Sequence, residues 1–315
     1  MSAPHSSRSS IRSFLLLVSY FLFLISFLFL LSSCSVQLRP PIIEQGTEGL
    51  RIKITVGNNN VLYENTPASI LVDVENRGSS IVDHGILVLN VPEQYIESSR
   101  ELQEYLDLQG KSIDNPVGEM RQYDFNVKVR EMTEEAKQQS AIISASACYQ
   151  YTTIASPTLC LQRPGDNKPS CKEKSVSLGG QGGPLAVTNV EATLSPSEND
   201  RYIPIITLTV RNKDGGLIVD PENVLNACLG TDDSAKEGVV LLTAYLDHDG
   251  RPLTCGKSDS AGQTKINLKD GSATVTCKYA DGIPASEGTH NSQIIINLAY
   301  GYHDITTQKV VMRKT

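Results

Sequence analysis

The sequence has no tryptophan, and aromatic residues make up only 6% of its 315 residues. Sugar-binding platforms and membrane-interface belts depend on large aromatic rings, so this scarcity weakens both interpretations. A positive charge excess is also missing, because 28 lysines and arginines face 35 acidic residues, a formal net charge of −7. Phosphate backbones are bound by concentrated basic surfaces, so the composition argues against a nucleic-acid partner.

The motifs that usually mark an enzyme or a metal site are absent too. There is no HExxH, no GxSxG and no CxxC, and the GGQGG stretch lacks the Lys-Ser/Thr of a phosphate-binding loop. Asp247, Asp249 and Gly250 resemble the start of a calcium loop, but Arg251 stands where a further oxygen ligand is needed, so a turn is expected. We therefore predict no enzyme, no cofactor and no catalytic or metal-binding residues. The histidines are scattered singly, at His5, His84, His248, His290 and His303.

An apolar run near the N-terminus predicts export. Arg8 and Arg12 precede about 18 apolar and small residues from Phe14 to Leu31, the layout of a signal peptide. The run ends in Leu-Ser-Ser-Cys, which resembles a bacterial lipobox and implies that Cys34 is lipidated and becomes the first mature residue. An uncleaved membrane anchor and simple secretion are the alternatives. All three place residues 35–315 on the outer side of the cell membrane, extracellular or periplasm-like, with residues 35–49 as a Pro-containing tether.

Alternation with a period of two dominates the rest of the chain and predicts β-strands. In residues 122–131, Tyr123, Phe125, Val127 and Val129 fall on one face, and polar residues fall on the other. Such a strand is buried on one side only, as in an antiparallel sandwich. One short helix is expected at residues 99–108.

Two pairs of segments indicate an internal repeat. ILVDVENRGSS (70–80) aligns with ITLTVRNKDGG (206–216), and ACYQYTTIASPTLCL (147–161) aligns with LAYGYHDITTQKVVM (298–312). The predicted fold is therefore all-β, with two tandem immunoglobulin-like antiparallel sandwiches behind an N-terminal signal or anchor helix. The predicted boundaries are 1–34 for the signal, 35–49 for the tether, 50–163 for the first sandwich, 164–183 for a Gly- and Pro-rich linker and 184–315 for the second sandwich.

The strand–N.G–strand units in tandem behind an export signal resemble CARDB-type and related immunoglobulin-like domains of prokaryotic, especially archaeal, surface proteins. The similarity rests on ENRG, RNKDGG and the Tyr-x-Tyr segments. It implies a β-sandwich with an adhesive or spacer role and transfers no catalytic residue.

The six cysteines after Cys34 are expected to form disulfides, as exported proteins permit. If residues 142–152 and 156–161 form a hairpin, Cys148 lies opposite Cys160 on the outer face of the sheet, which favours a bond between them over free thiols or a metal site. Asp270-Gly271 predicts a type I′ hairpin turn that places Cys277 on the apolar side of its strand. Cys171, Cys228, Cys255 and Cys277 allow three pairings, among which we favour Cys255–Cys277 with Cys171–Cys228.

The resulting functional hypothesis is a membrane-anchored cell-surface protein that acts without catalysis in adhesion, partner binding or envelope structure. Its expected partners are the membrane, through the N-terminal lipid or helix, and another surface or envelope protein. The alternative is an accessory subunit of an envelope transport or secretion complex, which would need a large hydrophobic interface.

Overall fold

A computed structural model describes residues 45–57, 59–134, 136–230, 236–246, 250–256 and 262–315. These residues form an all-β, mainly antiparallel, sandwich-like structure of several sheets with very little helix, in which β2 (Val61–Tyr63) pairs with β20 (His290–Arg313) in parallel. The predicted signal or anchor and Cys34 lie outside the described residues, as do His5, His248, Asp247 and Asp249. Among the described residues, no helix combines the length and the apolar character needed to cross a membrane.

A four-stranded sheet is formed by the first repeat alone. Its order is β1-β3-β7-β5, all antiparallel. The predicted alternation is confirmed in β7, where Tyr123, Phe125, Val127 and Val129 are buried. The strands span Leu50–Val56 (β1), Pro67–Asn76 (β3), Met120–Val129 (β7) and Ile96–Ser98 (β5).

A six-stranded sheet holds the matching part of the second repeat. Its main path is β10-β11-β12-β18-β16, and β19 also pairs with β12. The inward residues of the two aligned segments are equally buried, which is why both carry β-branched or leucine side chains at alternate positions. The strands span Ser175–Ser177 (β10), Leu185–Ser197 (β11), Arg201–Asn212 (β12), Ser272–Lys278 (β18), Thr254–Cys255 (β16) and Ile283–Pro284 (β19).

A ten-stranded sheet is common to both repeats. Its main path is β15-β14-β20-β8-β4-β6, with β2, β9, β13 and β17 paired to it off that path. The strands span Arg251–Pro252 (β15), Val239–Leu246 (β14), His290–Arg313 (β20), Gln138–Ala155 (β8), Val82–Asn90 (β4), Gln103–Leu108 (β6), Val61–Tyr63 (β2), Thr158–Leu161 (β9), Leu217–Val219 (β13) and Thr264–Asn267 (β17).

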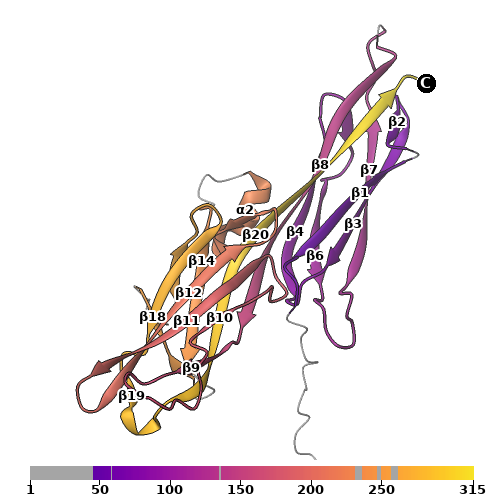
Figure 1. Cartoon of the computed structure of the whole chain (residues 1–315). Coiled ribbons are helices and arrows are strands. Elements are labelled where there is room, and N and C mark those ends of the chain that lie inside the picture. The colour runs from indigo at the N-terminus through magenta and orange to yellow at the C-terminus, as the bar shows by residue number, and fades with distance from the viewer. Residues whose placement is uncertain (1–44, 58, 135, 231–235, 247–249, 257–261) are drawn as a thin grey trace, which may run out of the picture. The chain divides into compact units, whose positions relative to one another are not determined.

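The two longest strands, β8 and β20, each serve both repeats. They pair antiparallel over 18 residues, from Ala155 opposite Ile296 to Gln138 opposite Arg313. Residues 138–148 of β8 and 303–313 of β20 lie with the strands of the first repeat, and we call this part the N-lobe. Residues 149–155 and 290–302 lie with the second repeat, the C-lobe. Each repeat therefore contributes the last part of its longest strand to the other lobe (Figure 1).

Helices are short in the described residues. The turn η1 (Pro221–Asn223) leads directly into α2 (Val224–Leu229), and η2 (Ala285–Glu287) precedes β20. Gly230 ends α2 in a left-handed conformation, with its amide donating to the Asn226 carbonyl at 3.0 Å. The segment η1–α2 lies between β13 and β14, and α2 packs on the outer face of the ten-stranded sheet against Ile86, Cys148 and Val219.

Several local expectations are corrected. The helix expected at residues 99–108 is wrong, because Leu106 and Leu108 alternate with exposed residues as parts of strand β6. The hairpin expected within residues 142–161 does not form, because β8 and β9 both pair with β20 instead of with each other.

The Asp270-Gly271 turn does form, but its two arms part. Both residues have a positive φ, and Lys269 and Ser272 exchange backbone hydrogen bonds across them. Beyond this turn, β17 pairs with β14 in the ten-stranded sheet and β18 pairs with β12 in the six-stranded sheet. The turn therefore connects two sheets, and the arms do not continue as one hairpin.

Candidate functional site at the strand crossing

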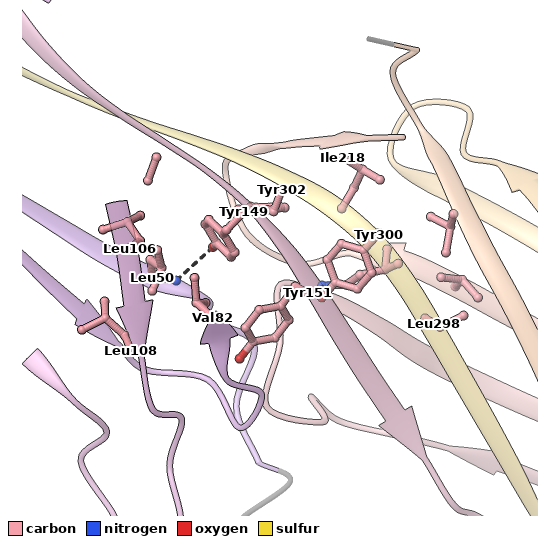
Figure 2. Packing of buried hydrophobic residues seen from close by; sticks show 14 of the residues in the cluster. Leu50, Val82, Leu106, Leu108, Tyr149, Tyr151, Ile218, Leu298, Tyr300 and Tyr302 are labelled. Carbon is pink, nitrogen blue, oxygen red and sulfur yellow. Dashed lines mark hydrogen bonds between the residues drawn. The ribbon is translucent and has the colours of Figure 1, made fainter. Parts of the chain in front are cut away.

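Four buried tyrosines mark the place where β8 and β20 pass from one lobe to the other. Tyr149 lies opposite Tyr302 and Tyr151 lies opposite Tyr300 in the ladder. The ring centroids are 5.8 Å apart in the first pair and 6.1 Å apart in the second, both tilted, which is a favourable aromatic geometry. Figure 2 shows these rings among the leucine and valine side chains of the surrounding core.

The first tyrosine of each Tyr-x-Tyr segment accepts a hydrogen bond from the start of the first long strand in the same repeat. The amide of Leu50 donates to the hydroxyl of Tyr149 at 3.0 Å, the interaction drawn in Figure 2. The amide of Leu185 donates to the hydroxyl of Tyr300 at 3.3 Å, and Thr153 shares a 2.9 Å hydrogen bond with the same hydroxyl. Because these amides are buried, the hydroxyls satisfy donors that would otherwise lack a partner.

The second tyrosine of each Tyr-x-Tyr segment accepts a hydrogen bond from the loop that follows β3 in the first repeat and β12 in the second. The Ser80 amide donates to the Tyr151 hydroxyl at 3.1 Å, and the Gly216 amide donates to the Tyr302 hydroxyl at 2.8 Å. Tyr151 also donates to the Gly182 carbonyl at 3.0 Å. The equivalent hydroxyls in the two repeats thus have equivalent backbone partners.

An asparagine holds the same loop in each repeat. Asn76 donates to the Ser80 carbonyl at 2.8 Å, and Asn212 donates to the Gly216 carbonyl at 2.8 Å. Each side-chain oxygen also accepts from the amide two residues ahead, as in an Asx turn. The Asn76–Asn212 match read from the sequence therefore has a physical cause.

Burial determines the ionisation of the groups at the crossing. Removal from water raises the pKa of Tyr149, Tyr151, Tyr300 and Tyr302 above the usual tyrosine value, so all four stay neutral hydrogen-bonding groups. Burial, followed by the charge of Asp214, raises the pKa of Asp304 to about 6. The tyrosine cluster is therefore suited to holding strands in place and not to proton transfer near neutral pH.

A disulfide and a histidine lie on the outer face of the same crossing. Cys148 of β8 bonds to Cys228 of α2, with the two Cα atoms 5.8 Å apart. His303 of β20 is the ladder partner of Cys148. The Nε2 atom of His303 is buried without a hydrogen-bond partner, and burial lowers the pKa of the imidazole.

The close contact between α2 and β20 depends on Gly301. A Cβ atom at this position would lie 2.6 Å from the Cβ of Val224. Gln150, which faces Gly301 in the ladder, donates from its side chain to the Pro221 carbonyl at 2.8 Å. The glycine and this hydrogen bond seat the η1–α2 segment directly over the crossing.

The disulfide connectivity differs from the expected one in two of three bonds. Cys148 bonds to Cys228, and Cys160 bonds to Cys171, so the expected Cys148–Cys160 and Cys171–Cys228 bonds are wrong. The cause is the pairing of β9 with β20, which moves Cys160 away from Cys148. Cys255 bonds to Cys277 as favoured, and Cys277 is fully buried.

The stretch expected to be a linker is packed in its second half. Strand β10 pairs with β11, and the side chain of Gln181 is buried, where it accepts from the Val187 amide at 2.9 Å. The amide of Gly182 donates to the Gly46 carbonyl, and its own carbonyl accepts from Ser79. Its glycines permit close backbone approach, a role that composition alone does not separate from flexibility.

The remaining histidines that the structure describes lie apart from one another. His84 is exposed beside Asp83, and His290 lies 3.8 Å from Glu287. A hollow of about 440 Å³ lies between His84, Gln150 and the η1–α2 segment. The histidine that sequence reasoning missed is His303, since 155 residues separate it from Cys148 and only the strand pairing brings them together.

Exposed apolar side chains lie on the outer face of the N-lobe part of the ten-stranded sheet. Tyr105 is 78% exposed, Ile142 is 67% exposed and Ile305 is 50% exposed. The register places Tyr105 in the row of Cys148, and Ile305 in the row of Ser146. Because side chains two residues apart share a face, Ile142 lies on this face as well. We call Tyr105, Ile142 and Ile305 the outer apolar face.

No protein-family model matches the chain, and no curated protein matches it. Among solved structures, red sea bream transglutaminase is similar at 10% identity over 84% of this chain, with a TM-score of 0.19. The chain spans 32% of that enzyme's length. A DUF4466 family protein from Parabacteroides merdae is similar at 9% identity, with a TM-score of 0.15, over 80% of this chain and 99% of its own.

Proposed function

We propose that the protein is a membrane-tethered, outward-facing surface protein whose two immunoglobulin-like units act by contact and support, without catalysis. The observation that carries the proposal is the combination of an all-β body closed by three disulfides with an apolar leader that ends at Cys34. Three disulfides indicate an oxidising compartment, extracellular or periplasmic. The leader supplies both the export signal and the attachment to the membrane.

The crossing of β8 and β20 supports a mechanical role. A tandem of independent units is joined by one linker, whereas these two lobes share two strands and a continuous cluster of buried side chains. Bending the lobes against each other would break backbone hydrogen bonds of the ladder and expose buried tyrosine rings. Such a body suits a spacer that carries a contact surface.

The outer apolar face is the contact surface that we propose. Contiguous exposed apolar patches are typical of interaction sites, and we propose that these three side chains, which share one sheet face, belong to such a contact. Tyr105 and the two isoleucines supply apolar area, and Tyr105 adds a hydroxyl. The resemblance to CARDB-type domains supports the same adhesive role.

The anchoring is tested by the intact mass of the protein extracted from membranes. We expect a mass that starts at Cys34, carries added acyl chains and falls by six hydrogens for three disulfides. A mass that includes residues 1–33 would show an uncleaved anchor, and a cytosolic protein with all of its cysteines reduced would contradict the proposal.

The contact surface is tested by placing a photo-crosslinking amino acid at Ile305 in cells. We expect a crosslink to another envelope or surface protein. The matched control is the same amino acid at Thr55, which is exposed on β1 of the opposite sheet. Equal crosslinking from both positions, or none from position 305, would contradict the assignment of this face.

The outer apolar face also favours the second candidate, an accessory subunit of an envelope transport or secretion complex. Such a subunit needs an apolar interface on its folded body. Detergent extracts distinguish the two, because the subunit would migrate in a stable large complex and the surface protein would migrate as a smaller species.

A further inference from the structure

The outer side of the strand crossing brings three metal-binding side chains together. Cys148, Cys228 and His303 each offer a ligand atom, and these atoms all lie within 4.8 Å of one another. They come from three elements, β8, α2 and β20, so the cluster exists only in the folded chain. In the described residues no other group of three such side chains is as close, so the Cys160–Cys171 and Cys255–Cys277 bonds lack a third donor.

His303 stands out at this position because its Nε2 atom is buried and unpartnered. A buried polar atom without a partner destabilises the folded chain, and a bound group that it contacts would remove that cost. The neighbouring sulfur atoms are poor hydrogen-bond partners, but with imidazole they form a typical donor set for Zn²⁺. Part of the side chains of Cys228 and His303 is open to solvent, which gives an entry path.

We propose that reduction of the Cys148–Cys228 bond creates a Zn²⁺ site of two thiolates and one imidazole. A dithiol of the surroundings supplies two electrons and two protons: the Cys148–Cys228 bond breaks, two thiols form, and the dithiol becomes a disulfide. Zn²⁺ then replaces the two thiol protons, which go to solvent, and the His303 ring nitrogen completes three protein ligands. A fourth position is left for water, as in open zinc sites.

The geometry allows this exchange with little change in the backbone. Zn–S bonds of about 2.3 Å at tetrahedral angles place two sulfur atoms a little under 4 Å apart, farther than in a disulfide. Rotation of the two cysteine side chains supplies this separation, since the Cα atoms lie 5.8 Å apart. The disulfide and the metal are thus alternative occupants that hold α2 to the crossing in the oxidised and reduced protein.

The experiment is a Co²⁺ titration of the dithiol-treated, desalted full-length protein under nitrogen, followed by Zn²⁺ competition. We expect one Co²⁺ per chain with thiolate-to-cobalt charge-transfer absorption, and none in the oxidised protein. His303→Gln should weaken binding by about tenfold or more, because even supporting residues of metal sites contribute that much. His290→Gln should leave it unchanged, and C148S/C228S should abolish it.

The other disulfides provide the matched controls. C160S/C171S and C255S/C277S should keep the Co²⁺ site, because neither pair has a third donor among the described residues. Co²⁺ binding by the His303→Gln protein that equals binding by the unaltered protein would overturn the proposal. Loss of binding in both control proteins, with binding kept by C148S/C228S, would overturn it too.

A variant that leaves two disulfides closed covers the case in which full reduction unfolds the chain. Cys148→Ser frees Cys228 beside His303, so this protein should bind Zn²⁺ weakly without reductant. Adding His303→Gln should remove that binding. The proposal would also be overturned if neither the reduced protein nor the Cys148→Ser protein bound the metal.

Discussion

The two lobes share one set of interactions and differ in what covers them. In both, a tyrosine binds the first long strand, a second tyrosine binds the next loop, and an asparagine closes that loop. In the N-lobe the chain continues from this loop into the single strand β4. In the C-lobe it runs through short β13 and then through η1 and α2 before β14 begins.

This difference separates the interactions that stabilise both lobes from the segment that is inserted in the C-lobe. The shared hydrogen bonds satisfy buried backbone groups in both lobes, so they serve stability. The inserted η1–α2 segment adds Cys228 over the crossing, and Gly301 leaves room for it. The matched position in the first repeat is Gln150, which supports the segment from below.

The largest effect is expected from removing the part of β20 that crosses into the N-lobe. A chain that ends at Tyr302 loses the buried side chains of Val310 and Met312 and the ladder partners of β8 and β2. We expect the N-lobe to lose cooperative folding, because each buried apolar truncation alone costs about 2–5 kcal/mol. Limited proteolysis should then cleave within β3 and β7, whereas a chain ending at Arg313 should resist. Equal resistance of both chains would show that the crossing strand is dispensable.

The next effect concerns the disulfide that bridges the repeats. C148S/C228S should lower the free energy of unfolding by about 4–5 kcal/mol, and C160S/C171S by about 3 kcal/mol. The difference follows from loop entropy, because the sequence separations are 80 and 11 residues. Urea unfolding of the two oxidised variants gives both values. A larger loss in C160S/C171S would contradict the order.

Replacing Asn76 or Asn212 compares the stability of the same loop in the two lobes. Asn76 is fully buried and also donates to the Leu108 carbonyl at 3.1 Å, a bond without a counterpart among those that Asn212 makes. We expect Asn76→Ala to cost about 2–3 kcal/mol and Asn212→Ala about 1 kcal/mol, since unpaired buried groups dominate the loss. Thermal unfolding would measure both, and equal values would show that burial does not separate the loops.

The last comparison is a pH dependence that one lobe should show. The position matched to Asp304 in the first repeat is Thr153, which is neutral. The folded pKa of Asp304, about 6, lies above its ordinary value of 3.8, so the folded chain holds the proton more tightly. Its contribution to stability is full below about pH 4 and is lost as the pH rises through 6.

Asp304→Asn should therefore raise the free energy of unfolding at pH 7 by about 1–3 kcal/mol and change it little at pH 4. The check is urea unfolding at both pH values, with Asp83→Asn as an exposed control. A gain at pH 4 equal to that at pH 7 would contradict the assigned cause.

Local structure was largely readable from the sequence, and the way the repeats join was not. The alternation in β7, the Asp270-Gly271 turn and the Cys255–Cys277 bond depend on neighbours in the sequence or on one strand's two faces. The matched Tyr-x-Tyr segments were visible as well. They did not show that the two segments pair with each other. An aligned repeat fits strands that stay within their own repeat as well as strands that cross into the other lobe.

The missed features follow from that one ambiguity. Because β8 crosses into the C-lobe, the β9 strand that follows it pairs with the start of β20, and Cys160 bonds to Cys171 instead of Cys148. Cys148 then lies beside Cys228 of α2 and beside His303, which are 80 and 155 positions farther along the chain. The only sequence signal of this site was a cysteine that the second repeat replaces by Ala299.

The exchange of the longest strands between the lobes can be tested with one engineered crosslink. Ser144 of β8 and Thr307 of β20 are ladder partners inside the N-lobe, so S144C/T307C should form an intramolecular disulfide, seen by peptide mass mapping of the monomer. Independent tandem units would keep residue 307 with the second repeat, far from residue 144. A monomer with both new thiols free under oxidising conditions would contradict the crossing.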